Sequence, residues 1–315
     1  MHLLLRIVHL VLPYTRLELP GWGYLLRVFN VIGDQGLRWD GAPTKDVKLK
    51  ESGYVVSLNL ENWSERLTYF LGRYYDLELQ LLMNKCLRPG DRFIDIGANV
   101  GMISLHAAWL VASRGLVESF EPNPSCCQRI VESLSKNKIT QVKLFEMGLS
   151  DNVGSLTLKV ITKHSGMGTF AQPDEKQQEL ISDTFEVQVQ TGDSVILKNS
   201  TPVKLIKIDV EGFEYRVLKG ISQTLSRWYP IVVLEVAENW LKRAGTSRIE
   251  VCDYMRQFGY VAYGPSTRRR YLRHELTLTL IQDKDIDNVD FNDFVWVHPK
   301  SLGAGDLASL FSKVP

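Results

Sequence analysis

The stretch Asp91–Gly101, which reads D-R-F-I-D-I-G-A-N-V-G, constrains the fold of this chain more than any other. Its letters F-I-D-I form a short apolar run, typical of a strand buried on both faces and interrupted near its end by Asp95. A glycine turn follows at once, and the residues from Gly101 to Gly115 have a helical character. A strand, a glycine turn and a helix in this order form the nucleotide-binding corner of a doubly wound sheet.

The glycine spacing separates two kinds of cofactor. A dinucleotide fingerprint needs G-x-G-x-x-G, because its second glycine lets the backbone approach a pyrophosphate. This turn has only Gly97 and Gly101, with Ala98 and Asn99 among the residues between them. A donor without phosphates, such as S-adenosylmethionine, does not need that approach, and its ammonium and sulfonium favour a nearby carboxylate such as Asp95. The turn therefore favours S-adenosylmethionine, with a nicotinamide dinucleotide as the alternative.

Two further strands extend the predicted cofactor site. Leu116–Phe120 ends in Glu121, about the distance downstream at which an acidic residue pairs with ribose hydroxyls. The strand Val142–Glu146 is followed by Ser150 and Asp151. In a fold of this kind the loop there lies beside the adenine, so both residues are candidates for base contacts. The alternative is that the two glycines merely turn the chain and Glu121 lies in solvent.

A second informative stretch, Val203–Glu214, reads V-K-L-I-K-I-D-V-E-G-F-E. Its first half predicts a buried strand, whose period of two places Lys207 and Asp209 on one side. Asp209 and Glu211 then lie at the carboxyl edge of the sheet, where such folds place their sites. The next strand carries Glu235 near its end, so three carboxyl groups are expected at this edge.

These segments predict an α/β fold with a doubly wound, mostly parallel sheet and an N-terminal appendage of helices and a hairpin. The chain of 315 residues exceeds one typical domain. We expect an appendage over residues 1–76, a catalytic domain over 77–300 and a tail over 301–315. Residues 154–160 alternate strictly and predict an edge strand, and the sheet should close with two strands near 276–281 and 294–298. One helix is expected from Gly212 to about Arg227.

The N-terminal residues 1–13 are apolar but too short to span a bilayer, and Arg6 and His9 interrupt them. We expect a helix packed on the catalytic domain; a homodimer contact and a weak membrane-surface contact are the alternatives. The formal net charge of +1 gives no argument for nucleic acid as a partner. The four cysteines show neither metal-ligand nor disulfide spacing, which favours a reduced, cytoplasmic compartment.

With these residues in hand, the chain resembles the FkbM family of S-adenosylmethionine-dependent methyltransferases. The resemblance rests on L-R-P-G-D-R-F-I-D-I-G-A-N-V-G, F-E-P-N-P, G-L-S-D and I-K-I-D-V-E-G-F-E. It implies a class I methyltransferase, Rossmann-like fold and usually methylation of an oxygen on sugars or secondary metabolites. The family's Tyr-Glu pair reads Tyr75-Asp76 here, and Glu78 matches an acidic position nearby. The cofactor contacts expected from these motifs are Glu78, Asp95, Gly97, Ala98, Asn99, Gly101, Glu121, Pro122, Asn123, Ser150 and Asp151.

The expected reaction is O-methylation of a small-molecule or glycan acceptor, with a sugar hydroxyl favoured. A hydroxyl is a poor nucleophile, so a general base is expected. Asp209 is ranked first, with Glu211, Glu235 and His164 as the other candidates. Lys207 would hold Asp209 ionised or bind the acceptor oxygen, and a structural ion pair is its alternative.

Several alternatives stay open at this point. No metal site is expected, although Asp209 with Glu235, or with Glu238 and Asn239, resembles the oxygen ligands of a divalent ion. The residues between 162 and 184 predict a lid or binding loop. The basic run 268–270 predicts a solvated hairpin, or alternatively a grip on an anionic acceptor such as a uronate. An adaptor that keeps the fold without the chemistry is the non-enzymatic alternative.

Overall fold

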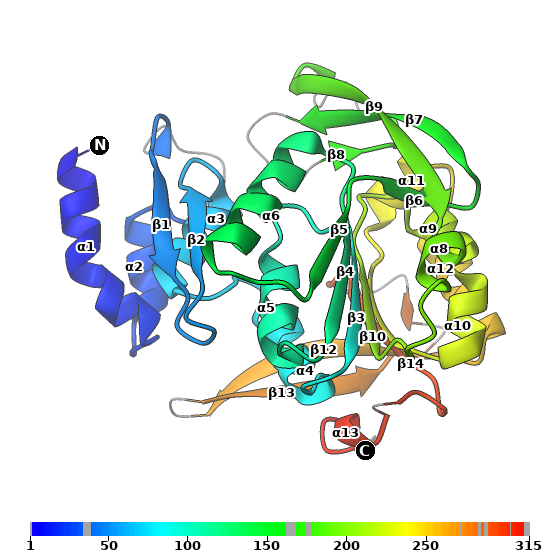
Figure 1. Ribbon diagram of the computed structural model, residues 1–315. Coiled ribbons are helices and arrows are strands. Elements are labelled where there is room, and N and C mark those ends of the chain that lie inside the picture. Colours follow the sequence, from blue (N-terminus) through cyan, green and yellow to red (C-terminus); the bar gives the residue numbers. More distant parts are fainter. Residues whose placement is uncertain are drawn as a thin grey trace.

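The computed structural model describes residues 2–33, 39–161, 168–173, 178–270, 273–282, 285–286, 289–302 and 304–311. At the centre of this part of the chain lies an eight-stranded sheet with the order β13-β12-β14-β11-β10-β3-β4-β5 (Figure 1). The five strands from β5 to β11 are parallel, and the other three pair antiparallel. The strands are β3 (Arg92–Ile96), β4 (Leu116–Phe120), β5 (Val142–Phe145), β10 (Leu205–Ile208), β11 (Ile231–Glu235), β12 (Val261–Arg270), β13 (Arg273–Leu280) and β14 (Asp293–Val297).

The strand order confirms the predicted doubly wound sheet. From β3 the chain proceeds to β4 and β5 on one side, and then returns to β10 and β11 on the other. The order therefore reverses between β3 and β10, and a crevice at such a switch point is where open α/β sheets bind ligands. In the paired register, Asp95 of β3 lies beside Lys207 of β10. The two stretches that the sequence singled out are thus neighbours at the switch point.

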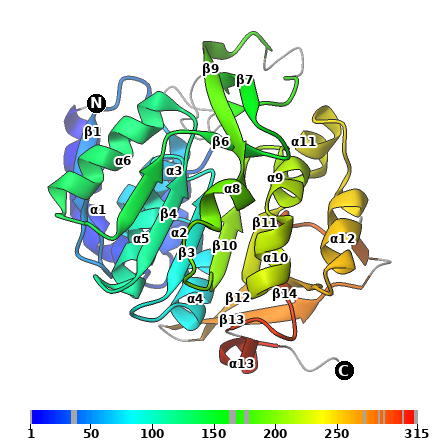
Figure 2. The same cartoon turned by 45° about the vertical axis from the view of Figure 1, so that its right-hand side comes forward.

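Helices cover both faces of this sheet and form two apolar cores. Because side chains alternate along a strand, Phe93 faces the core with α4 and α5, whereas Ile94 faces the core with α9, α10 and α12. Figure 2 shows α9, α10 and α12 together on one side of the sheet. The helices are α4 (Leu77–Cys86), α5 (Met102–Val111), α6 (Pro124–Lys136), α8 (Gly192–Ile196), α9 (Glu214–Gly220), α10 (Ser222–Trp228), α11 (Glu238–Arg243), α12 (Arg248–Gln257) and α13 (Ala304–Leu307).

A smaller sheet with the order β6-β9-β7-β8 lies beyond the end of the main sheet (Figure 1). It contains β6 (Gly148–Ser150), β7 (Gly154–Ile161), β8 (Gly168–Thr169) and β9 (Ile181–Thr191). The strand predicted over 154–160 forms as β7, but its predicted edge position is wrong, because β7 pairs with β9 on one side and with β8 on the other. The short strand β8 comes from the predicted binding loop, whose sequence gives no strand signal of its own.

The N-terminal segment contains α1 (His2–Arg16), α2 (Trp22–Val28), the hairpin of β1 (Thr44–Lys48) and β2 (Val55–Asn59), and α3 (Trp63–Leu71). The predicted packing is confirmed, because Val8 and Leu12 of α1 are buried in the same apolar core as α3 and α4. The Thr15 hydroxyl donates to the carbonyl oxygen of Phe70 at 2.7 Å. None of the described helices has the length and apolar character needed to cross a membrane.

Two further expectations need correction. Three strands, not two, complete the sheet, because Val261–Arg270 forms β12 and pairs with both β13 and β14. Pro265 within this segment weakens the strand signal in the sequence. The basic run does form the predicted hairpin, with Arg270 opposite Arg273. The single helix expected after Gly212 is divided into α9 and α10, because Gly220 packs so closely on strand β6 that a Cβ there would lie 2.0 Å from a carbonyl oxygen.

Candidate active site

The glycine turn after β3 packs directly on the end of β10. Gly97 has a φ of +79°, and a Cβ at this position would lie 1.9 Å from the carbonyl oxygen of Asp209. Only glycine has both the conformation and the space. The Lys207 ammonium donates to the carbonyl oxygen of Gly97 at 2.9 Å, so the turn is held against the neighbouring strand.

Glu121 closes the other side of this turn. Its two carboxylate oxygens accept the backbone N–H groups of Asn99 at 2.7 Å and Asn123 at 2.8 Å. Burial raises the pKa of Glu121 to about 7, although these two hydrogen bonds favour the ionised form. A carboxylate has about four acceptor sites, so both oxygens can still accept from the hydroxyls of a ligand.

A cavity of about 350 Å³ lies over the turn. Of the predicted cofactor residues, those lining it are Gly97, Ala98, Asn99, Glu121, Pro122 and Asn123. The far wall is apolar and includes Phe120, Met147 and Leu149. Sequence reasoning missed Met147 and Leu149 because nothing polar marks them. The cavity therefore combines a polar floor at the turn with an apolar end.

Asp95 and Gly101 lie beneath the turn and do not line the cavity. Asp95 is fully buried, accepts a hydrogen bond from Ser104 at 2.6 Å, and lies 3.8 Å from the Lys207 ammonium. Gly101 precedes α5 and packs against Ile130. Asp95 therefore does not face the cavity as expected. It lies next to the Lys207 ammonium and compensates its charge.

Ser150 and Asp151 also lie away from the cavity. Ser150 is buried, and the Asp151 carboxylate pairs with Lys219 and Arg216 of α9. These ion pairs hold the small sheet on α9, a role that the sequence does not indicate. His164 lies outside the described residues.

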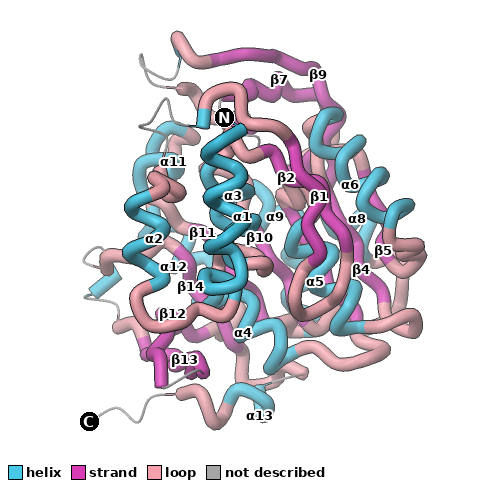
Figure 3. Tube along the Cα trace, turned by 90° about the vertical axis from the view of Figure 1, so that its left-hand side faces the viewer, coloured by secondary structure: helices cyan, strands magenta, loops and turns pink. Residues whose placement is uncertain are grey.

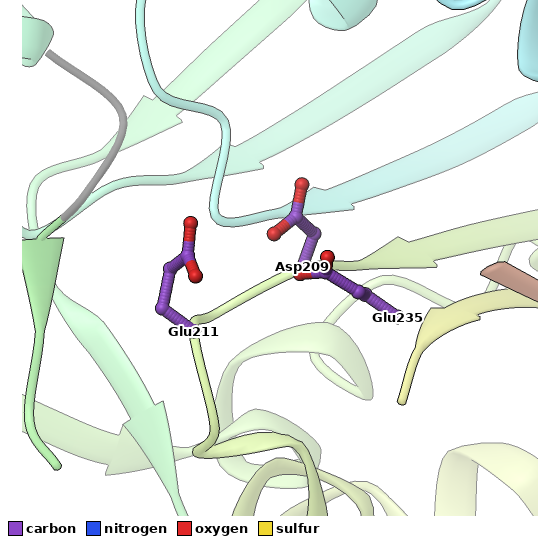
Figure 4. A group of neighbouring side chains, drawn as sticks. All are labelled: Asp209, Glu211 and Glu235. Atoms are coloured by element: carbon purple, nitrogen blue, oxygen red, sulfur yellow. The ribbon is translucent and has the colours of Figure 1, made fainter. Parts of the chain in front are cut away.

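Three carboxyl groups meet at the carboxyl edge of β10 and β11. Ligand oxygens of Asp209, Glu211 and Glu235 all lie within 4.8 Å of one another, and Figure 4 shows their arrangement. The Asp209 carboxylate lies 3.1 Å from the Lys207 ammonium. The three carboxyl groups thus lie at the carboxyl edge as predicted, and Lys207 lies on the same side as Asp209.

The surroundings of these three carboxyl groups shift their pKa values in opposite directions. Burial alone would raise the pKa of Asp209, but the Lys207 ammonium and a hydrogen bond with Glu235 together outweigh it and lower that pKa. Burial raises the pKa of Glu211 to about 8, and burial together with Asp209 raises that of Glu235 well above its usual range. Protonated Glu235 thus donates to ionised Asp209, and the charge of this half-buried cluster is largely compensated.

The backbone at Glu211 is held in a rare conformation. Glu211 has a φ of +52°, which is uncommon for a residue with a side chain and typical of functional sites. Glu214 stabilises this turn, because its buried Oε1 accepts the N–H groups of Val210 and Gly212, each at 3.1 Å. The hydroxyl of Thr169, from the small sheet, donates to the Glu211 carbonyl oxygen at 2.8 Å. The sequence analysis assigned no role to Glu214 or Thr169.

A second cavity of about 410 Å³ adjoins the first, since both are lined by Tyr74, Tyr75, Lys207, Asp209 and Glu235. Carboxyl groups dominate its polar lining. Besides the shared pair, these are Asp76, Glu78 and Asp293.

Most of the charged side chains that line these two cavities are acidic. Glu78, expected at the cofactor, lines the second cavity instead and accepts a hydrogen bond from Thr267 at 2.7 Å. Lys207 is the only lysine or arginine among the described residues that line either cavity. The basic run does not reach them, and Arg269 within it donates to the carbonyl oxygen of Glu18.

The carboxyl groups that could bind a divalent ion include one that the sequence analysis did not consider for this role. Glu238 accepts the backbone N–H of Arg248 at 2.8 Å and pairs with Lys242 at 3.1 Å, so it does not join the cluster. Glu211 takes the third position instead. An ammonium and a shared proton already compensate these carboxyl groups, which disfavours a metal ion there.

Comparisons with known proteins match the same region. The model of the Methyltransferase FkbM domain matches residues 95–262. Methyltransferase sdnD of Sordaria araneosa is 29% identical over 180 residues, which cover 48% of this chain and 68% of that protein. Hexuronic acid methyltransferase AglP of Haloferax volcanii is 26% identical over 191 residues, which cover 59% of this chain and 72% of that protein. The crystal structure of methyltransferase FkbM from Methylobacillus flagellatus matches at 12% identity and a TM-score of 0.38, over 75% of this chain and 53% of its own.

Proposed function

The chain belongs to the FkbM methyltransferase family, and on this premise we propose that it transfers the methyl group of S-adenosylmethionine to a hydroxyl oxygen of a sugar, polysaccharide precursor or secondary metabolite. One observation carries the proposal: a cavity over the Gly97 turn opens beside Asp209 into a second, acid-lined cavity. Two adjoining cavities suit a donor and an acceptor. Asp209 and Glu235 line both cavities, so they lie where the methyl group would pass, and Glu211 lines the first cavity next to them.

The first cavity fits the donor. Glu121 would accept from the ribose hydroxyls, and the apolar wall with Phe120 and Met147 would take the adenine. The turn lacks the glycine that lets a backbone approach a pyrophosphate, which disfavours a dinucleotide. When bound, S-adenosylmethionine supplies the methyl group, whose bond to sulfur breaks toward sulfur as the bond to the acceptor oxygen forms.

Glu211 is the residue that we assign as general base. A base works best when its pKa lies near the operating pH, and the pKa of Glu211 is about 8. Asp209 is a weaker base because its carboxylate is bound to Lys207 and hydrogen-bonded to Glu235. In the reaction the Glu211 carboxylate takes the hydroxyl proton. Asp209 and Lys207 orient the acceptor oxygen, and positioning of this kind supplies on the order of 7–11 kcal/mol.

The second cavity favours an acceptor that is neutral or positively charged. The relative AglP is named for a hexuronic acid, which carries a carboxylate. Here an anionic acceptor would face Asp76, Glu78 and Asp293 with no cation except Lys207, which already binds Asp209. A neutral polyol would instead donate its hydroxyl groups to these carboxylates and pack on Tyr74.

The proposal is tested first by binding and then by transfer. Calorimetry should show that S-adenosylhomocysteine binds and NADH does not; the reverse result would identify an oxidoreductase. Labelled methyl transfer should then be measured into glycan, lipid and small-metabolite fractions, with neutral sugars, amino sugars and uronates as separate acceptors. Binding of S-adenosylhomocysteine with no transfer to any fraction would favour the adaptor. We assign catalysis to residues 77–300 and place the enzyme in the cytoplasm.

A further inference from the structure

The outer side of the N-terminal helices exposes a row of large apolar side chains. Most other exposed apolar residues of the described chain are scattered singly over later elements. Clustered exposure of this kind is unusual on a soluble surface and marks an interaction site. The residues of this N-terminal apolar face are Ile7, Leu10, Tyr14, Leu17, Tyr24, Val28 and Ile32.

The face follows from the helical period of α1. Ile7, Leu10, Tyr14 and Leu17 recur at intervals of three and four residues, so they lie along one stripe. The opposite stripe, which includes Val8, is buried against the protein. Leu10 is 81% exposed and Leu17 is 67% exposed, so neither side chain is packed against the core. Figure 3 shows α1 and α2 on the side of the molecule that faces the viewer.

The exposed charged residues of the two helices have one sign. They are Arg6 and Arg27, which are exposed beside the apolar residues. Glu18 is the only acidic residue between positions 4 and 33, and it is 6% exposed. Its carboxylate is turned inward, where it pairs with Arg73 and Lys50. The exposed surface of the two helices therefore combines apolar side chains with cations only.

We propose that this face docks on the surface of an anionic lipid bilayer, with α1 lying in the plane of the interface. Amphipathic helices bind membranes in this way when apolar burial and attraction of basic residues to anionic lipid act together. A second copy of this chain fits the face less well. In a two-fold dimer the same patch meets itself, so Arg6 and Arg27 would face cations without an acidic partner.

Docking through α1 would bring the candidate active site close to the bilayer. The helix α1 packs on α3, and α3 contributes Trp63 and Thr68 to the lining of the first cavity. An acceptor carried by a lipid would then reach the site without leaving the membrane surface. The docking proposal itself rests only on the N-terminal face and does not depend on the methyl acceptor.

Vesicle flotation of the full chain tests the proposal. We expect binding to vesicles of phosphatidylcholine mixed with phosphatidylglycerol, weaker binding to phosphatidylcholine alone, and loss of the difference at high salt. The double variant Leu10→Ser with Leu17→Ser should bind at least about tenfold more weakly, because two exposed leucines no longer enter the interface. Arg6→Gln with Arg27→Gln should weaken binding to the mixed vesicles on the order of tenfold. Val153→Ser is the matched control, because Val153 is 70% exposed and lies between β6 and β7, outside the N-terminal helices.

Two outcomes would overturn the proposal. One is that the protein binds neither the mixed vesicles nor the vesicles of phosphatidylcholine alone. The other is a dimer, seen by light scattering, that the two leucine substitutions dissociate while vesicle binding is unchanged. Since both leucines are exposed, an unchanged thermal midpoint is expected and confirms that the variants remain folded.

Discussion

The Lys207 ammonium lies 2.9 Å from the carbonyl oxygen of Gly97, so one buried cation joins the glycine turn after β3 to the end of β10. The same ammonium lies 3.1 Å from the Asp209 carboxylate. The two cavities of the site therefore depend on a single residue, which lines both.

Replacing this cation should damage both stability and binding. Lys207→Met leaves the buried carboxyl group of Asp95 without its counter-charge, and breaking a buried ion pair costs about 3–5 kcal/mol. Urea unfolding should show this loss, and calorimetry should show weaker binding of S-adenosylhomocysteine. Lys242→Met is the control, since its pair with Glu238 is exposed and worth less than about 1 kcal/mol. Equal stability of the two variants would contradict the role assigned to Lys207.

Two effects make glycine necessary at position 97, the close contact with Asp209 and the positive φ, and their energetic costs can be measured separately. Gly97 and Gly245 both have a φ of +79°, but no atom lies within 4 Å of a Cβ built on Gly245. Gly245→Ala should therefore cost only the backbone strain, on the order of 1 kcal/mol. Gly97→Ala should cost several times more and abolish binding of S-adenosylhomocysteine, because the turn must move away from Asp209. Similar unfolding midpoints for both variants would refute the packing argument.

The base assigned in the reaction should determine the pH profile. Because the pKa of Glu211 is about 8, kcat/KM should rise through pH 7 and pH 8 and level off only above about pH 9, where the carboxyl group is fully ionised. Glu211→Gln should lower kcat on the order of 10²–10⁴-fold and leave binding of S-adenosylhomocysteine intact. Glu238→Gln, outside the cluster, should keep the wild-type profile. If Glu211→Gln retains the rise with pH, another group is the base.

Glu214 gives a prediction about stability. Burial raises the pKa of Glu214 to about 7, above its unfolded value near 4.5. A raised carboxyl pKa stabilises the fold below the unfolded value, and this contribution is lost as pH rises through 7. Glu214→Gln keeps an oxygen acceptor for Val210 and Gly212 but cannot ionise.

The variant should therefore gain free energy of unfolding relative to wild type between pH 5 and pH 8. Unfolding in urea at both pH values measures this difference. A difference that does not change with pH would mean that Glu214 titrates normally.

Methyl transfer should not depend on a divalent ion. The carboxyl groups of Asp209, Glu211 and Glu235 are compensated by Lys207 and by a shared proton, so a metal ion would have to displace both. Activity should be unchanged after dialysis against EDTA and should not increase with added Mg²⁺. Loss of activity in EDTA that Mg²⁺ restores would show instead that the cluster binds metal.

The sequence predicts those parts of the site that depend on local pattern. The Gly97 turn and the carboxyl groups after β10 and β11 follow from strand and turn signals together with the rule that sites lie at the carboxyl edge of a parallel sheet. The position of Glu121 in the site follows from its spacing downstream of the glycine turn. These residues need only the topology of the sheet to be placed.

What the sequence could not predict depends on packing between distant segments. Asp95 lies below the turn because Ser104 and Lys207 hold it there, and Asp151 turns to the cations of α9. The second cavity combines Asp76 before α4 with Asp293 on β14, residues that no local pattern connects. A carboxyl group that faces a cavity and one that supports its wall look alike in a sequence.

The hydrogen bond from Thr169 to the Glu211 carbonyl oxygen has a consequence for turnover. Thr169 belongs to β8, so the small sheet is attached to the backbone of Glu211 itself. A shift of this sheet on substrate entry would rotate Glu211 as well. Because Gly168 of the same strand lines the first cavity, occupancy of that cavity and the orientation of Glu211 would be coupled through this one hydrogen bond.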